Sequence, residues 1–360
     1  MRGEKVAQLC REYGISRKTG DKLKQRFKRL GEAGLLDQSR APNVIPHRTP
    51  PELVKLIVEE RKRHPTWGPK KLKVILEERL QRALPAASTL GDILAQAGLV
   101  NTRRRNRRVS PQPTTLREAL SPNDVWCIDY KGQCALRDRT MCYPLTLTDQ
   151  HSRFILGCEG MVRISDEAAR ETCEEIFRKY GLPKVIRSDN GVPFASSGLA
   201  NLTKLSSYWL RLGIGLERIR PAHPEENGQH ERMHRTLKFE TMRPPRTNLL
   251  QQQERFDAFV EEFNNTRPHE ALGMKRPAQL YKSSPRKFPA DLGEPDYPEH
   301  DDVVHVHRCG SLFFRRRKVF LSAALALQPV GLREENDGRW LVTFMNLNLG
   351  YLDGRGFIAL

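Results

Sequence analysis

Three acidic residues of this chain could together hold divalent metal ions. Asp129 lies in VWCIDYKG and Asp189 in KVIRSDNG, and each lies at or near the end of a short run rich in Val and Ile, residues that favour strands. Glu231 lies in NGQHERMHRTLKFE, in the first turn of a predicted helix. Two strand ends and a helix can bring three carboxylates together, and carboxylate oxygens are ligands that Mg²⁺ prefers.

A pair of bound metal ions at these carboxylates would support one type of reaction, the displacement at a phosphodiester. Two divalent ions about 3.5–4 Å apart can activate an attacking hydroxyl and stabilise the leaving oxygen of a phosphodiester displacement. Each acidic residue also has a simpler interpretation, as a turn or cap residue for the aspartates or as part of an exposed, ion-paired helix for the glutamate. The three together favour the metal-site hypothesis, with Mg²⁺ as the expected cofactor, Mn²⁺ as its substitute and two ions when DNA is bound.

The helix that carries Glu231 is predicted to begin at Asn227 and Gly228 and to end before Pro244, because proline cannot continue a helix. At about 100° of rotation per residue, the face that carries Glu231 also carries His234, Arg235 and Lys238. One histidine near this site could orient DNA or a water molecule at the metal, but a hydrogen-bonded structural role is the simpler interpretation. These histidines are His223, His230 and His234.

Five segments occur in a fixed order along the chain: WCIDYKG, LTLTDQHSRFIL, RSDNGVPF, RPAHPEENGQHERMHRTLKFE and FNNTRPHEALGMKRPAQLY. In these segments the chain resembles the DDE transposases of bacterial insertion sequences, whose catalytic core is retroviral-integrase-like and has a ribonuclease-H-like fold. The resemblance implies that Asp129, Asp189 and Glu231 are the catalytic, metal-binding triad. It also implies that Arg235 and Lys238 hold the transposon end, and it suggests DNA contacts for Arg267 and His269.

Positive charge is concentrated at the start of the chain. The 360 residues carry a net charge of +18, and the first 108 contribute 26 Lys and Arg against 11 Asp and Glu. A basic region with helical periodicity is typical of binding to the DNA phosphate backbone. A solvated basic surface is the alternative.

Two helix-turn-helix modules are predicted in this basic region, over residues 1–40 and 50–102. The first lacks the initial helix of the usual three-helix unit, so we expect a shortened N-terminus; its second helix begins after Ser16 and presents DNA-binding cations at Arg17, Lys18 and Lys22. In the second module, Ser88 is the expected cap of the last helix. Residues 103–121 form a basic linker that either grips DNA through Arg103, Arg104 and Arg105 or is a flexible tether.

The remaining residues predict an α/β region followed by an all-β region. Over 122–284, strand patterns at 125–135, 141–148 and 154–161 precede a helix that follows Ser165, and further strands and helices come after it. Residues 300–360 alternate short β-rich runs with turns, including one at 346–349. The fold class is therefore multidomain: helical DNA-binding modules, a ribonuclease-H-like core with a mixed sheet, and a small barrel-like domain.

Together these observations predict a DNA transposase that cleaves transposon ends and transfers strands into target DNA. Its partners would be double-stranded DNA and further copies of the chain. No apolar run reaches the roughly 18 residues of a membrane span and no signal peptide is apparent, so a cytoplasmic, DNA-associated protein is expected. The seven cysteines form no CxxC pair, which argues against structural zinc. A non-catalytic, transposon-derived DNA-binding regulator and a nuclease of the same fold are the alternatives.

Overall fold

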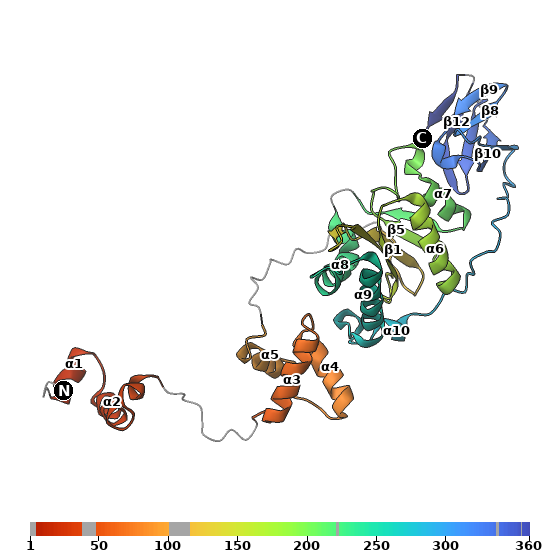
Figure 1. Cartoon of the computed structure of the whole chain (residues 1–360). Coiled ribbons are helices and arrows are strands. Elements are labelled where there is room, and N and C mark those ends of the chain that lie inside the picture. The colour runs from red at the N-terminus through yellow and green to blue at the C-terminus, as the bar shows by residue number, and fades with distance from the viewer. Residues whose placement is uncertain (1–4, 38–47, 101–115, 221–222, 336–337, 354) are drawn as a thin grey trace. The chain divides into compact units, whose positions relative to one another are not determined.

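The computed structural model describes residues 5–37, 48–100, 116–220, 223–335, 338–353 and 355–360. The chain divides into two compact units, Met1–Val54 and Lys55–Leu360 (Figure 1). The predicted linker residues Arg103, Arg104 and Arg105 lie outside the described part of the chain. None of the helices in the described ranges is long and apolar enough to cross a membrane.

The first unit contains α1 (Val6–Glu12) and α2 (Arg17–Leu30), followed by a 3₁₀ turn at Gly31–Leu35. Ser16 caps α2 as predicted, since its side chain accepts a hydrogen bond from the backbone N–H of Thr19 at 3.1 Å. The two helices pack closely where Cys10 meets Gly20, and a Cβ added at Gly20 would lie 2.3 Å from the Cys10 sulfur. Glycine is therefore required at this contact.

Helices α3 (Pro51–Arg63), α4 (Pro69–Leu80) and α5 (Ala87–Gln96) follow. In this region the largest fully buried side chains are those of Ile57, Trp67, Leu72, Leu76, Leu90 and Leu94. The prediction that Ser88 caps α5 is wrong, because the N-cap is Ala86 and Ser88 lies inside the first turn. The helix starts earlier than predicted because α5 begins without any side-chain cap, so that apolar packing rather than capping fixes its first residue.

A mixed sheet forms the centre of the second unit. Its strands are β1 (Val125–Tyr130), β2 (Cys134–Ala135), β3 (Met141–Asp149), β4 (Ile155–Met161), β5 (Val185–Ser188) and β6 (Gly215–Arg218). Along the sheet the order is β2-β3-β1-β5-β6, and β4 also pairs with β3. The β1–β3 and β3–β4 pairs are antiparallel, whereas β1–β5 and β5–β6 are parallel. The single strand predicted over 125–135 is divided in two at Gly132, whose φ is +63°.

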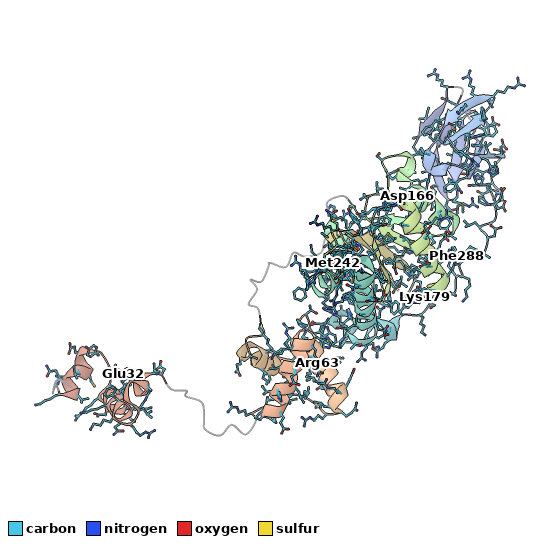
Figure 2. The ribbon with its side chains drawn as sticks, in the orientation of Figure 1. Glu32, Arg63, Asp166, Lys179, Met242 and Phe288 are labelled. Atoms are coloured by element: carbon cyan, nitrogen blue, oxygen red, sulfur yellow. The ribbon has the colours of Figure 1, made fainter. Side chains whose placement is uncertain are left out.

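Helices cover both faces of this sheet (Figure 1). On one face α6 (Asp166–Tyr180) and α7 (Lys204–Arg211) pack on Trp126 and Ile128 of β1. Beyond the last core helix, Phe288 returns to this side and packs on Phe177 of α6, with ring centroids 6.1 Å apart (Figure 2). As predicted, α6 begins directly after Ser165, which caps the helix by accepting from the backbone N–H of Ala168 at 3.1 Å.

On the other face lie α8 (Gly228–Thr241), α9 (Leu249–Glu261) and the short α10 (Pro277–Leu280). The predicted apolar stripe of α9 is core, since Phe256, Phe259 and Phe263 pack with Leu237 of α8 against Cys158 of β4. These contacts fix the position of α8 on the sheet.

The C-terminal region is antiparallel β structure. Its strands are β7 (Asp302–His305), β8 (Ser311–Phe314), β9 (Arg317–Phe320), β10 (Pro329–Glu334), β11 (Trp340–Phe344), β12 (Leu347–Leu352) and β13 (Phe357–Ala359). Five of them form a sheet in the order β13-β12-β11-β10-β7, and β8 pairs with β9. The turn predicted at 346–349 is misplaced, because β12 already begins at Leu347. The predicted fold class, from helical modules through a mixed-sheet core to an all-β region, is confirmed.

Candidate active site

Strand alternation turns Asp129 toward α8. Trp126 and Ile128 belong to the core cluster on the α6 side of the sheet, so the side chain of Asp129, one position further, points to the opposite side. On β3, Leu145 and Leu147 likewise pack on the α6 side, which leaves Thr146 facing α8. The polar side chains of β1 and β3 therefore meet the buried face of α8.

Asp189 follows the last residue of β5, which lies beside β1 in parallel register. Cys127 is paired with Arg187, so Asp129 and Asp189, each two residues further, reach the same edge of the sheet. The Asp189 carboxylate is oriented by the backbone N–H of Gly191, which donates to its Oδ1 at 3.0 Å. Such a turn leaves the other carboxylate oxygen available to a ligand.

The charges of the three acidic residues interact. Burial, together with the negative charges of Asp189 and Glu231, raises the pKa of Asp129 to about 7, against the opposing effect of Lys131. Asp129 is therefore a carboxylate whose ionised form is disfavoured by two neighbouring carboxylates. This is the electrostatic situation that a bound cation relieves.

A cavity of about 480 Å³ lies beside Asp129 and Glu231. Arg235 and Lys238, exposed on α8, line it together with Lys131. Carboxylates and cations thus border one space, where the cations can contact a phosphate while the carboxylates hold a metal ion. As predicted, Glu231, Arg235 and Lys238 lie exposed on one face of α8. His234 was predicted to lie on the same face, but its side chain is buried, with 2% exposed.

His234 and His230 form a buried network with the sheet. The Thr146 hydroxyl lies 2.8 Å from His230 Nε2, 2.6 Å from His234 Nε2 and 3.1 Å from the backbone carbonyl of Asp129. A carbonyl can only accept, so the single hydroxyl proton of Thr146 goes to Asp129 and both Nε2 atoms donate to its oxygen. Thr148 in turn donates to His230 Nδ1 at 2.9 Å. Burial lowers the pKa of both histidines, that of His230 to about 3, so both are neutral.

This hydrogen-bond pattern leaves one nitrogen lone pair unused. His234 Nδ1 carries no proton and lies 3.6 Å from Asp129 Oδ2, so the contact is not an ion pair despite its distance. Two electron-pair donors, the Asp129 carboxylate and His234 Nδ1, face each other at this point. His230 lies within the same 4.8 Å cluster, but its Nε2 donates to Thr146 and its Nδ1 accepts from Thr148. Carboxylate oxygen suits Mg²⁺ and Mn²⁺, and imidazole nitrogen suits transition-metal ions, so Asp129 and His234 offer donors that fit a divalent cation.

The raised pKa of Asp129 predicts a pH dependence of stability in EDTA. The folded state keeps this proton between about pH 4 and pH 7 while the unfolded state loses it, so the free energy of unfolding should fall as pH rises through that window. Asp129→Asn removes this contribution. Urea unfolding of both chains at several pH values measures it, and equal pH slopes would contradict the prediction.

Gly191 makes room for the Asp189 carboxylate. A Cβ at this position would lie 3.1 Å from Oδ2 and 3.3 Å from Oδ1 of Asp189. Gly191→Ala should therefore displace the carboxylate by a few tenths of an ångström and slow the reaction proposed below about tenfold. Gly68→Ala is the matched control, because nothing lies within 4 Å of its added Cβ. Equal rates for the two variants in a DNA-joining assay would show that Asp189 need not be held so closely.

The predicted DNA-binding residues on helices are accessible. Arg17, Lys18 and Lys22 are exposed on α2, and Arg235 and Lys238 are exposed on α8. Arg267 and His269, in contrast, are only 6% and 7% exposed, so they do not form a surface contact. Their roles, like those of the acidic triad, stay predictions.

Sequence reasoning missed the Thr146 network, although a signal for it was present. His230 and His234 are four residues apart and hence on one helix face, and Thr146 and Thr148 are two apart and hence on one strand face. Nothing in the sequence indicated that these two faces meet.

Comparisons with known proteins agree with this fold. Two models of the integrase core domain match residues 119–224 and 212–277, and a model of a homeodomain-like domain matches residues 19–94. The Gag-Pol polyprotein of baboon endogenous virus is 31% identical over 172 residues, which are 48% of this chain and 9% of that protein. An uncharacterized 31.7 kDa protein of insertion element IS407 from Burkholderia multivorans is 28% identical over 195 residues, covering 51% of this chain and 65% of that protein.

Both relatives are matched over less than two thirds of their own length. Among solved structures, the simian T-cell lymphotropic virus intasome in complex with PP2A regulatory subunit B56 gamma aligns with 81% of this chain and 97% of its own, at 17% identity and a TM-score of 0.41. The fold and the sequence matches define a protein with an integrase core and a homeodomain-like domain. The resemblance to the DDE transposases of bacterial insertion sequences is confirmed.

Proposed function

We propose that this chain is a DNA transposase, a divalent-metal-dependent polynucleotidyl transferase. It would cleave DNA at the ends of an insertion element and join the resulting 3′ ends to target DNA. The observation that carries the proposal is the interaction of Asp129 with Asp189 and Glu231 at one sheet edge, beside a cavity that cations also line.

Asp129, Asp189 and Glu231 would hold the metal ions, which are expected to be Mg²⁺, with Mn²⁺ as a substitute and two ions when DNA is bound. When bound, such ions offset the repulsion among the carboxylates and increase the electrophilicity of the phosphodiester. The Thr146 network holds α8 against β3 and so sets where Glu231 stands relative to Asp129.

The cations would position DNA. Arg235 and Lys238 on the exposed face of α8 would bind backbone phosphates next to the scissile bond, where they line the same cavity as the carboxylates. Arg17, Lys18 and Lys22 on α2 would add a contact outside the core, as would Arg103, Arg104 and Arg105. Two element ends must be brought together, so an assembly of two or more chains on DNA is part of the proposal.

The domain boundaries are proposed as predicted: modules at 1–40 and 50–102, a linker at 103–121, the catalytic core at 122–284 and the β domain at 300–360. Both integrase core matches fall within or next to the proposed core, which supports that assignment.

A joining assay tests the function. The purified chain is incubated with labelled DNA carrying the element's ends, a target plasmid and Mg²⁺ or Mn²⁺. Joined product that disappears in EDTA is the expected result. Cleavage without joining would indicate a nuclease of the same fold rather than a transposase. Specific DNA binding with no reaction in either metal would favour the DNA-binding regulator.

A further inference from the structure

A second cavity, of about 220 Å³, lies along a different flank of α8. Among its lining residues, only Arg235 also lines the cavity beside Asp129. The walls come from α4, from the turn between β3 and β4, from α8 and from the segment after α9. Five cationic side chains line it: Lys71, Arg153, Arg232, Arg235 and Arg267.

Little negative charge in the cavity offsets these cations. Asp149 is the one acidic residue of the described lining, and its carboxylate is already engaged by the backbone N–H of Asn123 at 2.7 Å and by Ser152, whose N–H and hydroxyl donate at 2.7 and 2.6 Å. Within the described chain, the side chains of Lys71 and Arg153 have no hydrogen-bond or ion-pair acceptor.

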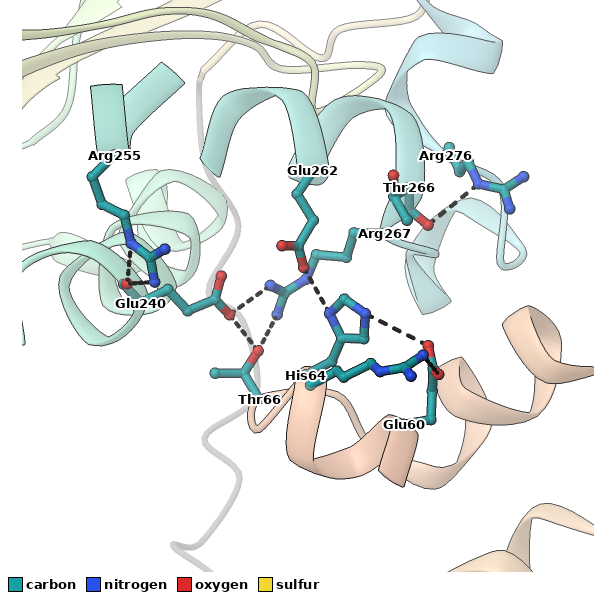
Figure 3. A network of polar contacts seen from close by, with 10 residues as sticks. Glu60, His64, Thr66, Glu240, Arg255, Glu262, Thr266, Arg267 and Arg276 are labelled. Atoms are coloured by element: carbon teal, nitrogen blue, oxygen red, sulfur yellow. Dashed lines mark hydrogen bonds and ion pairs between the residues drawn. The ribbon is translucent and has the colours of Figure 1, made fainter. Parts of the chain in front are cut away.

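Arg267 is held at the cavity by a polar network (Figure 3). Its Nη1 donates to Glu240 Oε1 at 3.0 Å and its Nη2 to the Thr66 hydroxyl at 3.3 Å, and Thr66 also donates to Glu240. Nearby, His64 Nδ1 lies 3.0 Å from Glu262 Oε1. The charge of Arg267 is thereby offset by direct contacts, whereas the side chains of Lys71 and Arg153 have no such contact among the described residues.

Burial makes these cations costly to hold. It lowers the pKa of Lys71 to about 8, with Arg267 as the next cause, while Glu240 and Glu270 partly counteract the shift. Burial also lowers the pKa of Arg153, and the charge of Arg232 adds to the effect. A bound anion would instead stabilise the charged forms of Lys71 and Arg153 and so raise the pKa values of both side chains.

A buried polar atom without a partner also lines the cavity. His269 is 7% exposed, and its Nε2 has no hydrogen-bond partner among the described residues. The ring is hydrogen-bonded on its other side to the backbone of Phe263, with which it also stacks edge to face at 4.6 Å. Gln229 contributes a second unpartnered atom, its Oε1. Buried polar groups of this kind are normally paired with protein, water or a ligand.

We propose that this cavity binds a phosphate group. Lys71, Arg153 and Arg232 supply the charge and the hydrogen-bond donors. The unpartnered Oε1 of Gln229 and Nε2 of His269 are acceptors, so each can bond only to a donor such as a water molecule or a protonated phosphate oxygen. Because Lys71 belongs to α4 and the others belong to the core, the bound phosphate ties α4 to the turn after β3 and to α8. The phosphate could come from the DNA backbone, in which case the proposal rests on the proposed function, or from free phosphate.

Calorimetric titration of the full chain with inorganic phosphate, in chloride buffer, is the first test. Arg153→Gln should weaken phosphate binding about tenfold, the loss expected for one charge-assisted contact. Arg163→Gln is the matched control, since Arg163 is exposed and does not line the cavity. All chains also carry Asp189→Asn, so that phosphate binding is measured independently of any catalysis.

The second test measures binding to random-sequence duplex DNA by fluorescence anisotropy across a salt series. A weaker Arg153→Gln complex, with a salt slope smaller by about one unit, identifies the DNA backbone as the source. Weaker phosphate binding with unchanged DNA binding identifies free phosphate. Arg153→Gln behaving like Arg163→Gln in both tests would overturn the proposal.

A third test does not depend on any variant. Crystals of the wild-type chain soaked in selenate should show an anomalous peak between Lys71 and Arg153, and a cavity without that peak would contradict the site. The outcomes separate the two proposals, because a chain that joins DNA but binds no phosphate here disproves only this inference. A chain that binds phosphate but joins no DNA disproves only the transposase.

Discussion

Asp189→Asn will abolish DNA cleavage and strand transfer, lowering both rates by at least about a thousandfold, while leaving DNA binding intact. The reason is electrostatic, because the amide keeps the shape of the carboxylate but removes the charge that would hold a divalent ion, and with it several kcal/mol of transition-state stabilisation. Asp129→Asn and Glu231→Gln should have the same effect, since the charges of Asp189 and Glu231 both act on Asp129.

The measurement is the joining assay in Mg²⁺ and in Mn²⁺, beside an anisotropy measurement of DNA affinity. Asp291→Asn is the matched control, because Asp291 is exposed and far along the chain from the three acidic residues. Cleavage that persists in one of the three variants would remove that residue from the proposed triad. A loss of DNA affinity that parallels the loss of rate would point to misfolding.

Thr146→Val will destabilise the core by about 3 kcal/mol, because valine keeps the shape of threonine but leaves two buried imidazole N–H groups without partners and removes the hydroxyl's hydrogen bond to the Asp129 carbonyl. Thr146 is fully buried between β3 and α8, so water cannot replace the hydroxyl. The expected result is a lower urea midpoint for the transition of the core.

Thr146→Ser distinguishes the contribution of the hydroxyl group to stability from that of the methyl group. Serine keeps the donor and both acceptor positions, so it should retain most of the stability that valine loses. Thr247→Val controls for the substitution itself at an exposed position. A serine variant as unstable as the valine variant would mean that packing of the methyl group, rather than the hydrogen bonds, holds α8 on the sheet.

The local sequence determined where helices and strands form and which side of each is buried. The helix starts after Ser16 and after Ser165 are predicted correctly, because the cap that fixes each start is a contact within three residues. The periodicity around Glu231 predicted α8, since the helix repeat and the proline stop are local properties. The start of α5 and the turn before β12 were misplaced, because there packing and pairing with distant residues decide the boundary.

The sequence also placed three acidic residues at ends of elements, which was enough to propose a metal site. It could not show how their charges interact. The raised pKa of Asp129 depends on the parallel pairing of β1 with β5, which brings Asp189 to the same sheet edge, and on the docking of α8.

Only the tertiary structure revealed the two features that lie between elements. The Thr146 network needs a strand face and a helix face to meet across more than 80 residues of sequence. The cationic cavity combines Lys71, Arg153, Arg232 and Arg267, which are separated by long stretches of chain. Local patterns report which side of an element is buried, but which buried sides face each other is settled by the packing of the whole core.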